Sequence, residues 1–208
     1  MPGAQQSDAQ RGSARLGDRV LAERRELIAD AALDVLEAEG GRGLTHRAVD
    51  RRAELPEGST SNYFPTREAL LTAAMLRLVE LDSPAVRAME DLVPGGPYAP
   101  RRAAELVADL VDEMLSVERT PLAVARYELV LEARRRPEFQ AAFNEVRREF
   151  LLFTEKLLPS AGCTQPREHA RELLALFDGL MVNQLFQPAT VLSRDQIVDY
   201  LERFFVSC

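Results

Sequence analysis

Apolar residues recur at every third or fourth position along most of this chain, which is the spacing of one face of an α-helix. Residues 18–39 carry such a face, and Gly40 and Gly41 end it. The same pattern predicts helices over residues 98–118, 121–135, 137–158, 166–187 and 193–205. Because no segment shows the two-residue alternation that is typical of a half-buried strand, we expect an all-α fold.

Local residue types support several of these boundaries. Pro121 and Pro137 stand where a first helical turn tolerates proline, because the missing N–H would have no helical partner there. Ser193 and Gln196 have the spacing of a capping box that starts the last helix. In residues 137–158 the apolar spacing alternates between four and three, which predicts packing along another helix; these residues are Phe139, Phe143, Val146, Phe150, Phe153 and Leu157.

Residues 44–70 follow a different pattern, with two short helices joined by a tight turn. Thr45 can cap the first, which directs Ala48, Val49 and Ala53 inward and three arginines outward: Arg47, Arg51 and Arg52. The turn begins at Glu54, and the second helix is expected from Pro56 to Phe64. A helix faced with Gly, Ser, Thr and Asn buries little surface but can hydrogen-bond to phosphates and base edges, so the pattern predicts a DNA-reading head.

These patterns divide the chain into three parts. Residues 1–17 are rich in Gly, Ser, Gln, Ala and Arg, and we expect a disordered tail because they bury too little apolar surface. Residues 18–65 form the helix-turn-helix head. A fourth helix begins at Thr66, a good cap, and opens a larger helical body over residues 66–208.

Charge qualifies the DNA-reading hypothesis. The chain has a formal net charge of -7, so the field of the whole molecule repels DNA. Within residues 42–67, however, five arginines outnumber three acids. We therefore expect modest, salt-dependent DNA affinity that depends on a few placed arginines.

The remaining chemistry argues against an enzyme and a membrane protein. Cys163 and Cys208 form no C-x-x-C motif and are expected to make no metal-ligand cluster, which indicates a reducing cytoplasm. The two histidines are His46 and His169, and no glycine-rich phosphate loop or metal-ligand spacing is present, so we expect no enzyme activity, no metal and no cofactor. No apolar run approaches the roughly 20 residues that a membrane span needs.

The order of these elements resembles the TetR family of bacterial transcriptional regulators. The shared features are a long first helix, Thr45 opening a second, a polar third helix ending in Tyr63 and Phe64, and the segment Thr66-Arg67-Glu68-Ala69-Leu70-Leu71. They lie within about residues 20–72. The resemblance implies an α-helical homodimer with two N-terminal DNA-binding heads and C-terminal bodies that dimerise and bind a small-molecule inducer.

Carried over by position, the resemblance implies specific DNA contacts. Thr45 and His46 would meet a phosphate, and Arg47 is the expected arginine contact. Residues Gly58, Ser59, Thr60, Ser61 and Asn62 would lie in the major groove, with Tyr63 and Arg67 touching the DNA backbone. The chain has Ser61 where the family often has Tyr, and Glu54-Leu55-Pro56 where the family has Gly-Val-Ser.

In the body, two further sites are expected. A ligand pocket could be lined by Met75, Met114, Tyr127, Phe143, Phe177 and Asn183, although stripes of Met and aromatic residues are more often plain core. Residues 170–187 are apolar on more than one side, and the resemblance places the dimer bundle in the last two helices. The interface is therefore predicted at Leu173, Phe177, Gly179, Leu180 and Gln184, with a buried helix in a monomer as the alternative.

Together these observations predict a cytoplasmic, sequence-specific DNA-binding regulator. Its expected mode is repression from a pseudo-palindromic operator in double-stranded DNA, relieved when a small molecule binds the body. The alternative is a ligand-binding or protein-interaction module without specific DNA binding, which the overall acidity favours.

Overall fold

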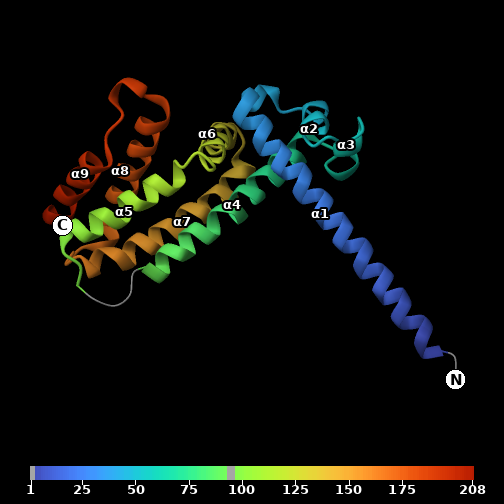
Figure 1. The fold of residues 1–208 in the computed structure, drawn as a ribbon, viewed down its shortest axis with the longest axis horizontal. Helices are drawn as coiled ribbons and strands as arrows, with labels where there is room; N and C mark the ends of the chain where they lie inside the picture. Colours follow the sequence, from blue (N-terminus) through green and yellow to red (C-terminus); the bar gives the residue numbers. More distant parts are fainter. Residues whose placement is uncertain (1–2, 93–96) are drawn as a thin grey trace. The chain divides into compact units, whose positions relative to one another are not determined.

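The computed structural model describes residues 3–92 and 97–208, with side chains described outside residues 3–17, 83–92, 137–139, 141–143 and 145–146. Every regular element in this part of the chain is helical, and it contains no strand (Figure 1). The elements are α1 (Gly3–Gly43), α2 (His46–Arg52), α3 (Ser59–Tyr63), α4 (Arg67–Leu92), α5 (Pro100–Met114), α6 (Thr120–Arg135), α7 (Pro137–Ser160), α8 (Pro166–Phe186), the short 3₁₀ turn η1 (Pro188–Thr190) and α9 (Arg194–Ser207). The prediction of an all-α fold is confirmed.

The chain divides into two compact units, Met1–Arg77 and Leu78–Cys208, and the division falls within α4. In the first unit, which we call the head, α1 packs on α2 and α2 packs on α3 (Figure 1). Its core contains the predicted apolar face of α1, together with Val49 of α2 and Leu70 of α4. Arg77 of α4 donates to Asp30 of α1 at 2.7 Å, which joins the first and last helices of the head.

In the second unit, which we call the body, α5 packs on α9 and α7 packs on α8 (Figure 1). A single apolar core joins α5, α7, α8 and α9. The predicted capping box at the start of α9 is present, since Ser193 accepts from the amide of Gln196 and Gln196 accepts from the amide of Ser193. Pro121 and Pro137 stand in the first turns of α6 and α7, as predicted.

A buried charge group lies at the beginning of the body. Asp82 of α4 is 3% exposed and accepts hydrogen bonds from Arg119 at 3.3 Å and Arg126 at 2.8 Å. Burial raises the pKa of Asp82, although the adjacent Arg126 and Arg119 oppose that effect. Within the described residues the second carboxylate oxygen, Oδ2, has no hydrogen-bond partner, and the two arginines compensate this buried charge through Oδ1.

Two boundaries differ from the sequence predictions. The structure begins α1 at Gly3, within the segment predicted to be a disordered tail, because extending an existing helix through Ala, Gln and Arg needs no new nucleation. Gly40 still interrupts that helix, with φ 68°. The third helix begins at Ser59 and not at Pro56, because Gly58 adopts φ 89°, a left-handed conformation that no helix interior contains.

Candidate functional site

The turn between α2 and α3 is built from backbone geometry that the sequence only partly indicated. The amide of Ala53 closes α2 on the carbonyl of Val49, and Glu54 then adopts φ 54°, in the left-handed region that ordinarily favours glycine. Gly58 forms the N-cap of α3 and has no side chain to accept from the first amides of that helix. A partner from elsewhere must therefore satisfy those amides.

Asp50 of α2 is that partner. Its carboxylate is 2% exposed and accepts from the amide of Gly58 at 2.7 Å, the amide of Thr60 at 2.7 Å and the hydroxyl of Thr60 at 2.6 Å. Burial raises the pKa of Asp50, but the hydrogen bonds from Thr60 and Gly58 outweigh burial, and the net pKa lies below its ordinary 3.8. One buried carboxylate thus fixes the start of α3 against α2.

This arrangement corrects the prediction for Thr60. Thr60 is 0% exposed, and its hydroxyl is committed to Asp50, so it cannot reach a base edge. In the sequence, Asp50 is one of the three acids that the five arginines of residues 42–67 outnumber. The sequence indicates this role of Asp50 only through its position. An acid on a short helix, here followed by two arginines, can reach the first amides of the next helix and cap it.

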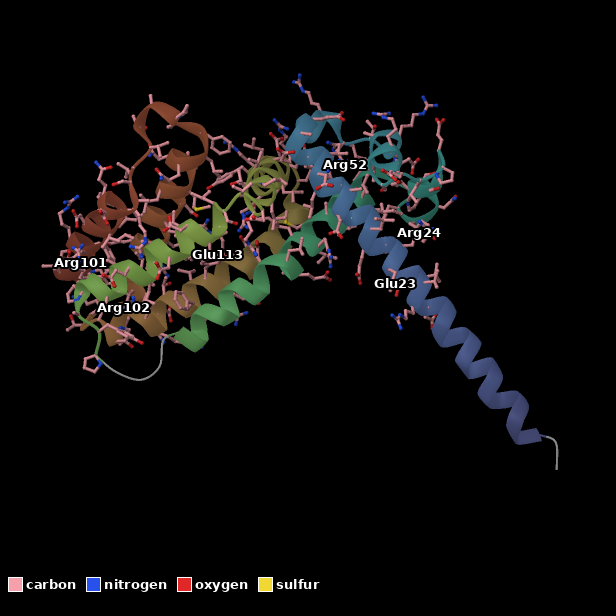
Figure 2. All side chains as sticks on the ribbon, in the orientation of Figure 1. Glu23, Arg24, Arg52, Arg101, Arg102 and Glu113 are labelled. Carbon is pink, nitrogen blue, oxygen red and sulfur yellow. A yellow bond between two sulfur atoms is a disulfide. The ribbon has the colours of Figure 1, made fainter. Side chains whose placement is uncertain are left out.

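The exposed side chains of α2 and α3 form the part of the head that is open to a partner. On α3, Ser61 and Asn62 are exposed, and the hydroxyl of Ser61 donates to the carbonyl of Gly58 at 2.8 Å. On α2, Arg51 and Arg52 are exposed; Arg52 pairs with Asp34 at 2.9 Å, and Figure 2 shows its side chain on the head. Arg47 pairs with Glu57 at 2.7 Å. Surface pairs of this kind contribute little, so a phosphate can replace them.

The other predicted DNA contacts have structural partners within the head. Thr45 is exposed and caps α2 by accepting from the amide of Ala48 at 3.2 Å. Nε2 of His46 lies 2.6 Å from the carbonyl oxygen of Phe64, and a guanidinium nitrogen of Arg67 donates to the carbonyl of Gly41. Ser59 and Tyr63 are half-buried. His46 and Arg67 therefore hold parts of the head together, whatever else they touch.

The body contains a small apolar cavity of about 10 Å³, which is room for about one water molecule. Ligand sites for small molecules occupy roughly 300–1,000 Å³, so this cavity must open before it could hold one. Among the described lining residues Thr154 alone is polar, and its hydroxyl already donates to the carbonyl of Phe150 at 2.9 Å. The cavity is lined by Val107, Leu110, Phe150, Phe153, Thr154, Leu173, Leu174 and Phe177.

Of the predicted pocket residues that the structure describes, Met114 and Phe177 share the core of the body and Tyr127 packs against it. Phe177 also lines the cavity, whereas Met75 lies in the core of the head. The ring of Tyr127 packs edge-on against Phe186 at 5.4 Å. Asn183 donates to the carbonyl of Thr190 at 2.9 Å, which holds η1 against α8. The side chain of Phe143 lies outside the described residues.

Burial within one chain corrects part of the predicted dimer interface. Leu173, Phe177 and Leu180 are at most 7% exposed, so they pack in the core of the body and offer almost no surface to a second copy. Gln184 makes two hydrogen bonds to the backbone of Leu192, at 2.9 Å and 2.8 Å, and supports the connection to α9. Gly179 is exposed and has open space around it.

The prediction that the cysteines form no cluster is wrong. Cys163 and Cys208 are joined by a disulfide across a sequence separation of 45, and Nδ1 of His169 lies 3.1 Å and 2.9 Å from the two sulfurs. Sequence spacing could not reveal this cluster because the turn after α7, the first part of α8 and the end of α9 come together only in the folded body.

Within residues 3–92 and 97–208, no helix combines the length and the apolar composition that crossing a bilayer demands.

Residues 99–206 match the family model described as "Tetracyclin repressor-like, C-terminal domain". No curated protein sequence matches the chain.

Solved structures extend the similarity to the head. The multidrug binding protein EbrR complexed with imidazole is 31% identical, with 88% of this chain and 89% of that chain covered and a TM-score of 0.63. A TetR-family member from Streptomyces coelicolor A3 is 31% identical, with 88% and 98% covered and a TM-score of 0.68. EbrR complexed with ethidium is 31% identical, with 88% and 98% covered and a TM-score of 0.64.

Proposed function

Because this chain belongs to the TetR family of transcriptional regulators, we propose that it binds operator DNA as a homodimer through α2 and α3 and leaves that DNA when a small molecule binds the body. The proposal is supported by the hydrogen bonds of Asp50, whose carboxylate accepts from the amides of Gly58 and Thr60 at the start of α3. Ser61 and Asn62 of α3 remain exposed. A helix held in this way can enter the major groove without losing its internal support.

The side chains of the head suit two kinds of DNA contact, to phosphates and to base edges. The exposed arginines of α2 would contact phosphates, which supply affinity without sequence information. The amide of Asn62 can pair with an adenine edge and the hydroxyl of Ser61 with either base type, so these two would carry sequence preference. Because each arginine that contacts a phosphate releases a counterion from the DNA, binding should weaken as salt concentration rises.

A mobility-shift assay on the DNA flanking the protein's own gene tests this proposal. Arg51→Ala should weaken binding about equally on all fragments and reduce the slope of log affinity against log salt by about 1. Asn62→Ala should instead change which fragments are preferred. Arg101→Ala is the matched control, because Arg101 is an exposed arginine of the body (Figure 2). Its side chain pairs with Asp199 and Glu202 of α9.

The outcomes separate the proposal from its rival. If no fragment is retarded specifically at low salt, the chain is a ligand-binding or protein-interaction module without specific DNA binding. If the Arg51 and Asn62 variants lose affinity in the same way on every fragment, the proposed division of roles is wrong.

The homodimer contact would use the face of α8 that the core leaves open. Ala175, Gly179, Val182 and Phe186 recur at spacings of four, three and four and are exposed; Val182 is 39% and Phe186 44% exposed. Tyr200 of α9 is 40% exposed. An apolar stripe of this spacing suits packing against the same stripe of a second copy about a twofold axis.

The ligand would be aromatic. This inference rests on the cavity among α5, α7 and α8, whose lining includes Phe150, Phe153 and Phe177 and offers no uncommitted charged group. EbrR was crystallised with ethidium and with malachite green; because ethidium itself intercalates into DNA, malachite green is the probe for titrations that include operator DNA. Regulation requires that ligand binds the DNA-free state more tightly, and the coupling must be reciprocal.

Titrations in both directions test this coupling. Malachite green should lower DNA affinity by the same factor by which operator DNA lowers malachite green affinity. If the two affinities prove independent, release by a ligand in the body is excluded for this probe, while the DNA-binding proposal stands or falls on the mobility shifts.

A further inference from the structure

The body carries a group of potential metal ligands that DNA binding and small-molecule binding leave unexplained. Cys163, His169 and Cys208 each offer one ligand atom, and these three atoms lie within 4.8 Å of one another. Cys163 is 7% exposed, and the other two residues are half-buried. A disulfide alone requires only the two sulfurs, so the position of the imidazole needs a separate reason.

Local structure aims all three side chains at one point. After α7 ends at Ser160, Gly162 adopts φ 89° and the amide of Cys163 donates back to the carbonyl of Leu158 at 3.0 Å, which turns Cys163 inward. His169 stands in the first part of α8, and its ring packs edge-on against Phe204 of α9 at 6.2 Å. That contact directs Nδ1 toward both sulfurs, which lie 3.1 Å and 2.9 Å away.

We propose that Cys163, His169 and Cys208 form a binding site for a thiophilic divalent metal ion of the zinc class when the disulfide is reduced. Two thiolates and one imidazole are ordinary ligands of Zn²⁺, and a set of three leaves a fourth position for water or another donor. Soft sulfur ligands disfavour Mg²⁺ and Ca²⁺, which prefer oxygen.

The geometry needs only a small adjustment to accept the ion. Zinc binds sulfur at about 2.3 Å and nitrogen at about 2.1 Å in tetrahedral sites, which separates ligand sulfurs by about 3.8 Å and sulfur from nitrogen by about 3.6 Å. Two thiols that no longer share a bond repel each other to nearly that separation. The Cα atoms of the cysteines are 5.0 Å apart, so side-chain rotation can supply the change.

The chemistry balances in two steps. A dithiol reductant transfers two electrons and two protons to the disulfide, becomes a cyclic disulfide and leaves two thiols on Cys163 and Cys208. Zn²⁺ then displaces both thiol protons to the buffer and accepts the lone pair of His169 Nδ1. The disulfide and the metal are therefore mutually exclusive occupants, and each joins the end of α9 to the turn before α8.

Titration of the full-length protein with Co²⁺ and then Zn²⁺ tests the proposal. The protein is reduced, freed of reductant without oxygen and shown by thiol titration to have two free thiols. We expect a sulfur-to-cobalt absorption band that saturates at about one ion per chain, the count that one three-ligand site predicts, and that Zn²⁺ abolishes. The oxidised protein should give no band.

Variants assign the ligands. C163S and C208S should abolish the band, and H169Q should weaken affinity by more than about tenfold, since even an outer partner of a metal ligand contributes that much. H46Q is the matched control, because it removes the chain's other imidazole, and it should leave the band unchanged. A reduced wild-type protein that binds neither ion, or serine variants that bind as well as wild type, would overturn the proposal.

A second measurement does not depend on the variants folding. In reduced wild-type protein, Zn²⁺ should protect both cysteines from alkylation, as read by mass spectrometry. Equal alkylation with and without Zn²⁺ would mean that the cluster is a disulfide pair with a neighbouring imidazole and no metal site.

Discussion

Replacing Asp50 with Asn tests how the head holds its exposed helix. The carboxylate accepts three hydrogen bonds from Gly58 and Thr60, whereas the amide of Asn has one accepting oxygen and one donating nitrogen. If the oxygen keeps both bonds from Thr60, the NH₂ group faces the Gly58 amide, and two donors meet. Losing one hydrogen bond to a charged acceptor costs about 1.5–3 kcal/mol, so we expect a local destabilisation of about 2–3 kcal/mol.

Hydrogen exchange measures this change where it occurs. A loss of about 2–3 kcal/mol should make the amides within residues 55–64 exchange about 30- to 150-fold faster. Asp50→Ala, which removes all three bonds, should have a larger effect of about 4 kcal/mol. Asp34→Asn is the matched control, because that acid pairs with Arg52 at an exposed surface and its loss should cost less than about 1 kcal/mol.

The pH dependence of stability gives an independent measurement. The folded-state pKa of Asp50 lies below its ordinary 3.8, so Asp50 contributes stability above that pH, and this contribution is lost as pH falls through the folded pKa. The Asn variant should lack that acid-dependent loss. Wild-type exchange rates in residues 55–64 together with unchanged DNA binding in the Asn variant would refute the role assigned to the carboxylate.

Three further substitutions test other features. Val182→Asp should shift the dimer toward monomer in sedimentation, because it charges the exposed apolar stripe of α8; an unchanged dimer would place the contact elsewhere. Asp82→Ala should lower the free energy of unfolding, measured in urea, by about 3–5 kcal/mol, because two arginines lose their buried partner. The control Asp109→Ala removes only an exposed ion pair and should lower it by less than about 1 kcal/mol. Ser193→Ala should lower it by about 1 kcal/mol through loss of the capping box, and no change would mean that the box does not stabilise α9.

Helices and most of their ends could be predicted because their signals are local. Ser193 caps α9 by a hydrogen bond to a residue three positions away, and Gly40 interrupts α1 through its own φ angle. Thr66 likewise caps α4 by accepting from the amide of Ala69 at 3.1 Å. Capping residues and helix-breaking glycines act within one helical turn, so helix ends can be predicted from them without knowledge of the fold.

Site residues were predicted less well because their roles depend on partners that are distant in sequence. Thr60 has the residue type of a base-contacting side chain, yet a carboxylate ten positions earlier takes its hydroxyl into the core. Leu173 and Phe177 are as apolar as Val182, and only packing against the rest of the body decides which of them faces solvent.

By itself, the sequence determined an all-α chain, the order of its helices and a short polar helix in a head with a local excess of arginine. These properties follow from periodicity and capping, which act over a few residues. Tertiary structure alone decided that Asp50 clamps α3, which side of α8 stays exposed, and that Cys163, His169 and Cys208 meet. Each of those outcomes depends on contacts between segments that are distant in sequence, and bringing such segments together costs chain entropy. The residues near each position in the sequence do not indicate which distant segments will meet.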